Sequence, residues 1–159
     1  MGQSFVGAGF DRHRLETGRP LILGGVEIPA DRGCVAHSDG DVLLHALTDA
    51  VLGAAGMGDI GDHFPPSDAK WKDAASEQFV RHALRLVRPR WSLSNVDATV
   101  FLEAPKLGPH KEAIAESIAR ICDIPSGVVN VKAKTGEGVG AVGRGECVDA
   151  HVAVILEIA

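Results

Sequence analysis

The pattern of apolar and polar positions predicts strand structure close to the N-terminus. Residues 4–10 are expected to form one short strand. The apolar triplets 21–23 and 26–28 flank Gly24-Gly25, which is typical of a tight β-hairpin. We therefore expect a strand and then a hairpin before the first helix.

Three helices are predicted from apolar residues that recur every three or four positions. The first covers residues 41–55, the second ends before Pro89, and the third is opened by Pro109, which suits the first turn of a helix. The inner sides of these helices are expected to carry Leu43, Leu44, Leu47, Val51, Leu52, Phe79, Val80, Ala83, Leu84, Val87, Ile114, Ala115, Ile118, Ala119 and Ile121.

The rest of the chain is predicted to form strands and glycine-rich loops. Residues 96–103 alternate as a strand does, and further strands are expected at 128–133 and 147–158. Segment 56–73 lacks periodicity and is long enough to be a binding loop, and 136–145 is expected to be a turn region. The apolar faces of the two longer strands carry Val96, Ala98, Val100, Leu102, Val148, Val152, Val154, Leu156 and Ile158.

Together these elements predict a single domain over residues 1–159, of the α/β or α+β class, with a mixed β-sheet covered by helices on one side. A chain of 159 residues with 45% apolar content suits one core and leaves little room for a second. The other face of the last strand carries Asp149, His151 and Glu157, so either water or another subunit would cover it.

Charge and cysteine usage narrow the classes of function. The formal net charge of -5 argues against nucleic-acid binding, because counterion release needs a basic surface. Cys34, Cys122 and Cys147 form no C-x-x-C pair, which favours a reducing compartment over a disulfide or a Cys-zinc site. We see neither an apolar run of about 18 residues, as a membrane span needs, nor a signal-peptide pattern, so we expect a cytoplasmic protein.

Asp11-x-His13 is the strongest local signal for chemistry. Residues two apart on a strand point to the same face, so a carboxylate and an imidazole would converge there. His45, on the first turn of the predicted helix, offers a third ligand. Asp, His and His with an open fourth position form the ligand set of a zinc ion that acts on a substrate oxygen. Such a pair also arises by chance, so spacing alone leaves the metal site undecided.

The segment His37-Ser38-Asp39-Gly40-Asp41 is also typical of a helix N-cap. Ser and Asp side chains satisfy the free amides of a first helical turn. The two interpretations are compatible, because the same amides favour a phosphate group. Asp39 and Asp41 could instead orient the metal-binding imidazoles, and the sequence does not separate these roles.

Six motifs occur in order over nearly the whole chain. They are Asp11-Arg-His13, His37-Ser-Asp-Gly-Asp-Val-Leu-Leu-His45-Ala-Leu-Thr-Asp49, Gly58-Asp-Ile-Gly61, Phe64-Pro-Pro-Ser-Asp68, Glu103-Ala-Pro-Lys106 and Gly143-Arg-Gly-Glu146. This ordered set resembles the 2-C-methyl-D-erythritol 2,4-cyclodiphosphate synthase family of the non-mevalonate isoprenoid pathway. The specificity of the resemblance lies in the order and number of the motifs.

The resemblance implies metal-binding and catalytic roles for particular residues. Asp11, His13 and His45 match the family's zinc ligands. Glu137 matches the ligand of a second divalent ion, Mg²⁺ or Mn²⁺, on the diphosphate. His37 and Thr135 match residues that stabilise the transition state.

The resemblance also implies a site for a CDP-linked substrate. Its parts are contacts to the phosphates and methylerythritol, a loop that closes over the substrate, a cytidine pocket and an anion-binding Arg. The implied residues are Asp11, Arg12, His13, His37, Ser38, Asp59, Ile60, Gly61, Phe64, Pro65, Pro66, Ser67, Asp68, Leu102, Glu103, Ala104, Pro105, Lys106, Leu107, Gly108, Lys134, Thr135, Gly136, Glu137, Ala141 and Arg144.

Simpler interpretations stay open for some of these positions. Asp59 could belong only to a turn, which is the usual role of Asp next to Gly. Lys106 could be a solvated side chain at a strand end, and Arg144 could face water from a hairpin turn.

The resemblance further implies a homotrimer with active sites between adjacent subunits. Some positions depart from the family pattern: Lys134 and Gly136 stand where many members have Thr, and Ala141 stands where many have Phe. In the family that Phe lines a cavity on the trimer axis that can hold an isoprenoid diphosphate. With Ala141, hydrophobic binding in such a cavity is in doubt.

In the implied reaction the substrate supplies its own nucleophile, because its 2-phosphate attacks the β-phosphorus of the CDP arm and releases CMP. A phosphate monoester, with a second pKa of about 6, is mostly dianionic at pH 7 and needs no general base. This agrees with the lack of a G-x-S-x-G motif or a Cys–His pairing in the sequence. Two other functions remain open: a zinc phosphohydrolase that activates water, and a non-catalytic nucleotide-binding trimer.

Overall fold

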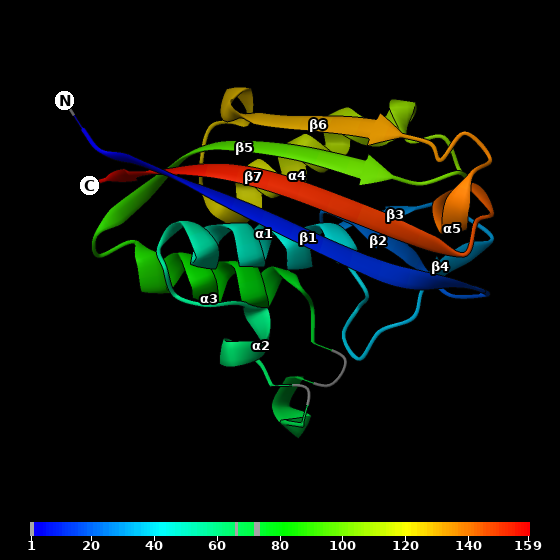
Figure 1. Cartoon of the computed structure of the whole chain (residues 1–159), viewed down its shortest axis with the longest axis horizontal. Coiled ribbons are helices and arrows are strands. Elements are labelled where there is room, and N and C mark those ends of the chain that lie inside the picture. The colour runs from blue at the N-terminus through cyan, green and yellow to red at the C-terminus, as the bar shows by residue number, and fades with distance from the viewer. Residues whose placement is uncertain (1, 66, 72–73) are drawn as a thin grey trace.

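A five-stranded mixed β-sheet forms the centre of the protein (Figure 1). The computed structural model describes residues 2–65, 67–71 and 74–159. The order of strands in the sheet is β4-β1-β7-β5-β6, and only β5 and β6 run parallel. The bounds are β1 Ser4–Thr17, β4 Arg32–Cys34, β5 Trp91–Phe101, β6 Val129–Lys134 and β7 Cys147–Ile158.

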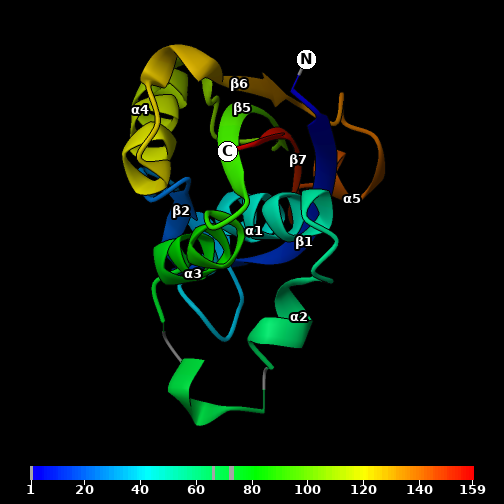
Figure 2. The same cartoon turned by 90° about the vertical axis from the view of Figure 1, so that its left-hand side faces the viewer.

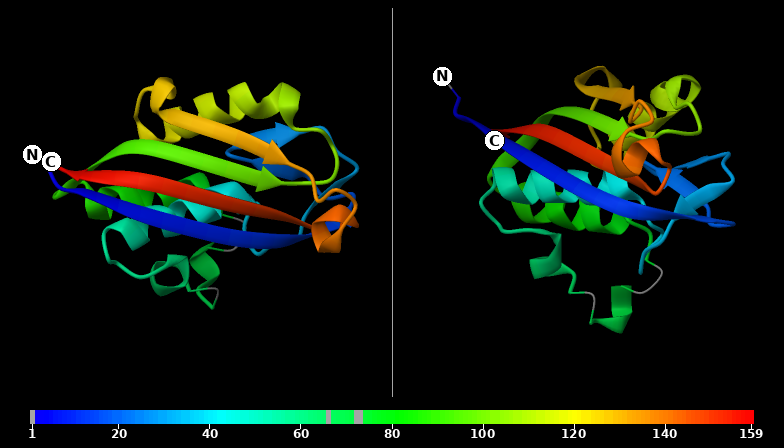
Figure 3. Two further views of the ribbon diagram at one scale, coloured as in Figure 1. Left: turned by 45° about the horizontal axis from the view of Figure 1, so that its top comes forward. Right: turned by 45° about the vertical axis from the view of Figure 1, so that its right-hand side comes forward.

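The first strand is twice as long as predicted, because tertiary pairing extends it. β1 continues through Asp11 and His13 to Thr17, and lies antiparallel to β7 from Ser4 to Arg14 (Figure 3). Its second half has polar side chains on both faces, so the alternation that marks a half-buried strand is absent from the sequence. Likewise, β5 begins five residues before the predicted start at 96.

The predicted hairpin is confirmed. β2 (Leu21–Leu23) and β3 (Val26–Ile28) pair antiparallel, and Gly24 and Gly25 both have positive φ angles, of 62° and 79°. Residues other than glycine rarely adopt this left-handed backbone at low cost. The hairpin lies beside the helix α4 (Lys111–Cys122), and the N–H groups of its two glycines donate to the side chain of Asp41.

All three long helices are confirmed and lie on one face of the sheet (Figure 2). They are α1 (Val42–Ala54), α3 (Glu77–Val87) and α4 (Lys111–Cys122), the last preceded by the 3-10 turn η2 (Gly108–His110). The apolar residues predicted for their inner sides are buried except Ala115, which is half-buried. Among the described residues, no helix combines the length and the apolar character that a membrane span requires.

The approach of α1 to β1 depends on two glycines. A Cβ atom on Gly7 or Gly9 would lie 1.9 Å from the carbonyl oxygen of Ala50 or Ala46, respectively. The helix backbone therefore rests directly on the strand backbone at these positions. This close contact fixes the middle of α1 against the first half of β1, next to the part of the strand that carries Asp11 and His13.

Some smaller details also differ from the sequence prediction. The segment expected to be a loop contains a one-turn helix, α2 (Ile60–His63), and the 3-10 turn η1 (Ala69–Trp71). The glycine-rich turn region contains α5 (Gly140–Gly143). A further 3-10 turn, η3 (Ser126–Val128), precedes β6. Ile158, predicted on the apolar face of the last strand, is 45% exposed because it lies at the end of the sheet.

Within the part of the chain that the structure describes, no long helix covers the second face of the sheet, which is turned toward the viewer in Figure 1. It presents exposed apolar side chains, among them Val6 at 72% and Phe10 at 49% exposure. Asp149, which the sequence placed on this face, is buried because Arg12 from β1 forms an ion pair with it.

Candidate functional site

Asp11, His13 and His45 converge on one point, as the sequence predicted. Oδ2 of Asp11 lies 2.9 Å from Nε2 of His13 and 3.1 Å from Nδ1 of His45. The two imidazole nitrogens are 3.2 Å apart. Asp11 and His13 come from the helix-facing side of β1, and His45 comes from the first turn of α1. In the described residues this is the one cluster of three side chains suited to a metal ion.

The geometry and charge of this cluster fit a divalent cation. For metal–ligand bonds near 2.0–2.1 Å, a tetrahedral site separates its ligand atoms by about 3.4 Å, close to the spacings here. Burial alone would raise the pKa of Asp11, but its hydrogen bonds with His13 and His45 and their charge hold that pKa well below its usual value. The carboxylate is therefore available as an anionic ligand. Two nitrogens that face each other also need a cation or a proton between them.

The second ring nitrogen of His45 has its own partners. Its Nε2 lies 2.8 Å from Oγ of Ser76 and 3.1 Å from Oγ of Ser38. Ser76 is fully buried and in turn contacts Oδ1 of Asp39. The corresponding atom of His13, Nδ1, is buried and has no hydrogen-bond partner within the described residues.

The structure separates the roles of Asp39 and Asp41, which the sequence left open, and it also gives a role to Asp49. Asp41 caps α1 by accepting from the backbone N–H of Leu44, and it also accepts from Gly24 and Gly25 of the hairpin. Asp39 reaches His45 through the Ser76 hydroxyl. Asp49 accepts from the N–H of Ile60 at 2.7 Å and so anchors the beginning of α2.

A pocket of about 310 Å³ opens onto the three converging side chains. The predicted residues His37, Ser38, Ile60, Gly61 and Phe64 line it. Four further residues line this pocket and were not predicted from the sequence: Val35, Ala36, Trp71 and Phe79. They could not be found because they match no motif and because Phe79 was assigned only to the helix core.

Aromatic packing closes one side of this pocket. The ring of Phe64 packs on Trp71 and Phe79, with centroid distances of 4.8 and 4.7 Å. Phe79 also faces the ring of His45 at 5.7 Å. The segment after α2 is therefore fixed to α3 by an apolar contact beside the possible metal ligands.

Four other predicted residues, Asp59, Pro65, Ser67 and Asp68, do not line this pocket. Asp59 forms a capping box with Asp62 at the start of α2, which agrees with the simpler turn interpretation of that residue. Pro65, Ser67 and Asp68 are exposed, and the side chain of Asp68 accepts from the N–H of Lys70. Pro66 lies outside the described residues.

A second pocket, of about 440 Å³, gathers most of the predicted cytidine and diphosphate residues. It is lined by Leu102, Lys106, Leu107, Gly108, Lys134, Thr135 and Glu137, together with Ala133 and the unpredicted Lys111. It shares no lining residue with the first pocket.

Two predicted residues build the wall of this region. Glu103 accepts from the N–H of Gly136 at 2.8 Å and so holds the glycine-rich loop against the end of β5. Glu137 has a positive φ of 53°, and its N–H lies 3.3 Å from Oγ1 of Thr135. Ala104 and Pro105 line a neighbouring hollow with residues 29–32.

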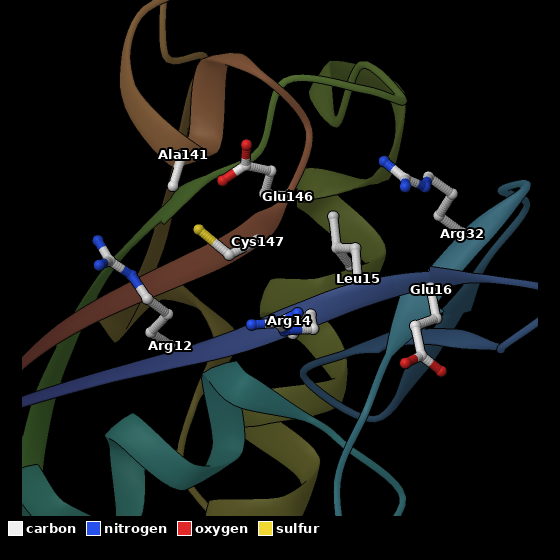
Figure 4. A pocket seen from close by; sticks show the side chains of 8 residues that line it. All are labelled: Arg12, Arg14, Leu15, Glu16, Arg32, Ala141, Glu146 and Cys147. Carbon is white, nitrogen blue, oxygen red and sulfur yellow. The ribbon is translucent and has the colours of Figure 1, made fainter.

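Arg12, Ala141 and Arg144 are not brought to the cluster of possible ligands. Arg12 lies on the opposite face of β1 from its two neighbours, and its guanidinium forms two hydrogen bonds with Asp149, of 2.6 and 2.7 Å. Arg12 and Ala141 line a separate pocket of about 440 Å³ between the second half of β1 and α5 (Figure 4). Arg144 is exposed and paired with Glu146.

Comparison with known proteins identifies the relatives of this chain. The YgbB family pattern matches residues 4–157. The chain is 54% identical over 155 residues to 2-C-methyl-D-erythritol 2,4-cyclodiphosphate synthase of Salinibacter ruber, covering 97% of this chain and 99% of the relative. It is 51% identical over 152 residues to the chloroplastic enzyme of Arabidopsis thaliana, covering 95% of this chain and 66% of that longer relative.

A solved structure agrees with these relatives. A 2C-methyl-D-erythritol-2,4-cyclodiphosphate synthase in a CDP-bound form superposes with a TM-score of 0.87 at 45% identity, over 95% of this chain and 99% of the other. Fold, motif order and overall identity therefore lead to the same assignment: the chain belongs to the YgbB family, together with the 2-C-methyl-D-erythritol 2,4-cyclodiphosphate synthases.

Proposed function

We propose that the protein converts 4-diphosphocytidyl-2-C-methyl-D-erythritol 2-phosphate to 2-C-methyl-D-erythritol 2,4-cyclodiphosphate and CMP, a step in making isoprenoid precursors. The observation that carries the proposal is the convergence of Asp11, His13 and His45 inside a pocket with room for a phosphate-bearing ligand. The relatives' names and the CDP in a similar structure supply the substrate class.

The reaction asks the protein to position the substrate. An oxygen of the 2-phosphate attacks the β-phosphorus, the bond from that phosphorus to the bridging oxygen breaks, and CMP leaves with the bonding electron pair. Holding two mutually repelling phosphates in line gives the large rate advantage of an intramolecular reaction. His37 and Ser38 line the pocket beside the cluster, where they can donate hydrogen bonds to phosphate oxygens.

We assign a zinc ion to Asp11, His13 and His45, because this mixed oxygen and nitrogen donor set with an open position suits zinc. Such an ion, when bound, supplies a Lewis acid that polarises a phosphate oxygen. A second divalent ion, Mg²⁺ or Mn²⁺, is assigned to Glu137, whose exposed carboxylate borders the second pocket.

The second pocket is assigned to the cytidine and diphosphate end of the substrate. Lys106, Lys111 and Lys134 line it, so positive charge is concentrated there although the chain carries a net charge of -5. Buried Leu102 and Leu107 supply an apolar floor. Thr135 lines the same pocket, where its hydroxyl can donate a hydrogen bond to a phosphate oxygen.

The site is proposed to be shared between subunits of a homotrimer. Within one chain the two pockets have no residue in common, although one substrate has to fill both. The exposed Val6 and Phe10 on the uncovered sheet face supply an apolar surface for self-association. A cytoplasmic location is also part of the proposal, because all three cysteines are buried and free, as suits a reducing compartment.

Phosphorus-31 NMR of the zinc- and magnesium-loaded protein with its proposed substrate tests this function. We expect the signals of a cyclic diphosphate and CMP to appear. Release of inorganic phosphate would instead show a phosphohydrolase, and binding of CDP without turnover would show a non-catalytic nucleotide binder. His45→Ala is expected to abolish turnover. Arg85→Ala, at an exposed position on α3 that lines neither pocket, is the control.

A further inference from the structure

Ser76 occupies the N-cap position of α3 but does not cap that helix. Its side chain makes no hydrogen bond to the amides of the first turn, which is the usual reason for a serine at this position. The residue is fully buried, and its Oγ lies 2.8 Å from Nε2 of His45 and contacts Oδ1 of Asp39. The buried hydroxyl of Ser76 therefore bonds to side chains outside its own helix, those of His45 and Asp39.

The contacts from Asp39 through Ser76 to His45 favour one arrangement of protons. A carboxylate only accepts, so the hydroxyl of Ser76 donates to Asp39. The oxygen of Ser76 then accepts from Nε2–H of His45. A neutral imidazole carries one proton, so Nδ1 of His45 keeps its lone pair. That nitrogen is the one that faces Asp11 and His13.

Further contacts fix the two ends of this series of hydrogen bonds, Asp39 and His45. Oδ2 of Asp39 accepts from the N–H of Ser76 at 2.9 Å, and its Oδ1 accepts from the N–H of Asp41 at 3.2 Å. The ring of Phe79, on the first turn of α3, packs beside the ring of His45. The beginning of α3 therefore holds both the tilt and the tautomer of an imidazole that belongs to α1.

We propose that Ser76 and Asp39 are positioning residues for the metal, because the chain from Asp39 through Ser76 to His45 presents Nδ1 of His45 as a ready ligand. The inference rests on the proposed function only in that a divalent ion binds at Asp11, His13 and His45. It assigns to the loop before α3 a role in metal affinity. His13 has no equivalent support among the described residues. At His45, Oγ of Ser38 is a second, longer contact of Nε2, at 3.1 Å.

The test is the zinc affinity of the metal-free protein, measured by competition with a chromophoric chelator. Ser76→Ala is expected to weaken zinc binding roughly 10- to 100-fold, as loss of such outer hydrogen bonds typically does. Thr48→Val is the matched control, because it removes a fully buried hydroxyl from α1 whose bond goes to the carbonyl of Leu44. The control is expected to bind zinc as the wild type does.

Two further measurements separate positioning from a general loss of structure. Nitrogen-15 NMR of the metal-free protein should show His45 with its proton on Nε2, and a mixture of tautomers in Ser76→Ala. Asp39→Asn should also weaken zinc binding, and combining it with Ser76→Ala should add little because both act through one chain.

A failure of the metal assignment and a failure of the positioning role of Ser76 give different results. If the wild type binds no zinc, the metal assignment itself fails. If the wild type binds zinc and Ser76→Ala binds it equally well, the metal assignment stands and the positioning role is wrong. If Ser76→Ala does not fold, Asp39→Asn decides: unchanged affinity there contradicts the inference.

Discussion

At the scale of single residues, Asp41 is a carboxylate taken fully out of water. It is 0% exposed and accepts from three backbone N–H groups, of Leu44, Gly24 and Gly25. Burial raises its pKa to about 6, although these hydrogen bonds act in the opposite direction. The folded protein therefore binds a proton at Asp41 more tightly than the unfolded chain does.

This difference predicts a pH dependence of stability. Because the pKa rises on folding, the contribution of Asp41 to the free energy of unfolding is fully present below about pH 4 and is lost as the pH rises through about 6. A rise from 3.8 to about 6 corresponds to about 3 kcal/mol. Urea unfolding between pH 4 and 7 should show the wild type losing stability relative to Asp41→Asn as the pH rises. A constant difference would contradict this.

The cluster of Asp11, His13 and His45 predicts stabilisation by metal. An ion that binds only the folded state raises its stability by about 2.7 kcal/mol when its free concentration is 100 times the dissociation constant. Zinc should therefore raise the melting temperature of the wild type and of His151→Ala. Asp11→Ala should show no such rise in the same differential scanning experiment, and an equal rise would place the ion elsewhere.

The sequence predicted those site residues that follow a local period. Asp11 and His13 point the same way because a strand repeats every two residues, and His45 follows from a helix start. Ser76 was not predicted, because it lies 31 residues from His45 and a serine before a helix indicates a cap. Arg12 follows its motif neighbours in sequence, yet the same two-residue period turns it to the opposite face.

At the scale of elements, the contact between α1 and β1 depends on the absence of a side chain. In Gly9→Ala the new Cβ would lie 1.9 Å from the backbone oxygen of Ala46, so strand and helix must separate. We expect a loss of about 3 kcal/mol or more in the free energy of unfolding, at the upper end for overpacked cores. Chemical denaturation measures it.

Gly53→Ala is the matched change inside α1. A Cβ there meets nothing within 4 Å, and the residue lies in regular helix. Alanine should stabilise the protein by about 0.5–1 kcal/mol, because glycine loses more backbone entropy in a helix. Similar effects for Gly9→Ala and Gly53→Ala would contradict the close packing of α1 on β1.

Helices with an apolar pattern of their own were predictable from the sequence. Elements that form only because another part of the chain pairs with them were not. The inner residues of α3 and α4 follow from helical spacing, because each of these helices buries one face. α1 is buried on most sides, and its many apolar residues made it predictable. The second half of β1 was missed, since its pairing with β7 and not its own alternation makes it a strand. The one-turn α2 was missed because its start depends on Asp49, which is distant from it in sequence.

At the scale of the whole molecule, the uncovered sheet face predicts self-association. Val6 is 72% exposed on this face, so Val6→Asp should place a charge in the proposed interface between subunits. We expect light scattering to give the mass of three chains for the wild type and a lower mass for Val6→Asp. Leu86→Asp, at a 37% exposed position on α3 in the helical layer, should keep the wild-type mass. A wild type with the mass of one chain would remove the proposed interface.

The single domain and its one-sided helical cover followed from the sequence, because the order of strands and amphipathic helices left few alternatives. The separation of the two pockets did not follow, since residues 102–108 and 134–137 come together because β5 and β6 pair in parallel, which the sequence does not show.

The most direct test of the account is anomalous diffraction at the zinc edge from crystals of the zinc-loaded protein. We predict one strong peak per chain, within bonding distance of Oδ2 of Asp11, Nε2 of His13 and Nδ1 of His45, with a further position open toward the pocket. A peak bound to other residues, or no peak at these three atoms in protein that turns over its substrate, would contradict the account.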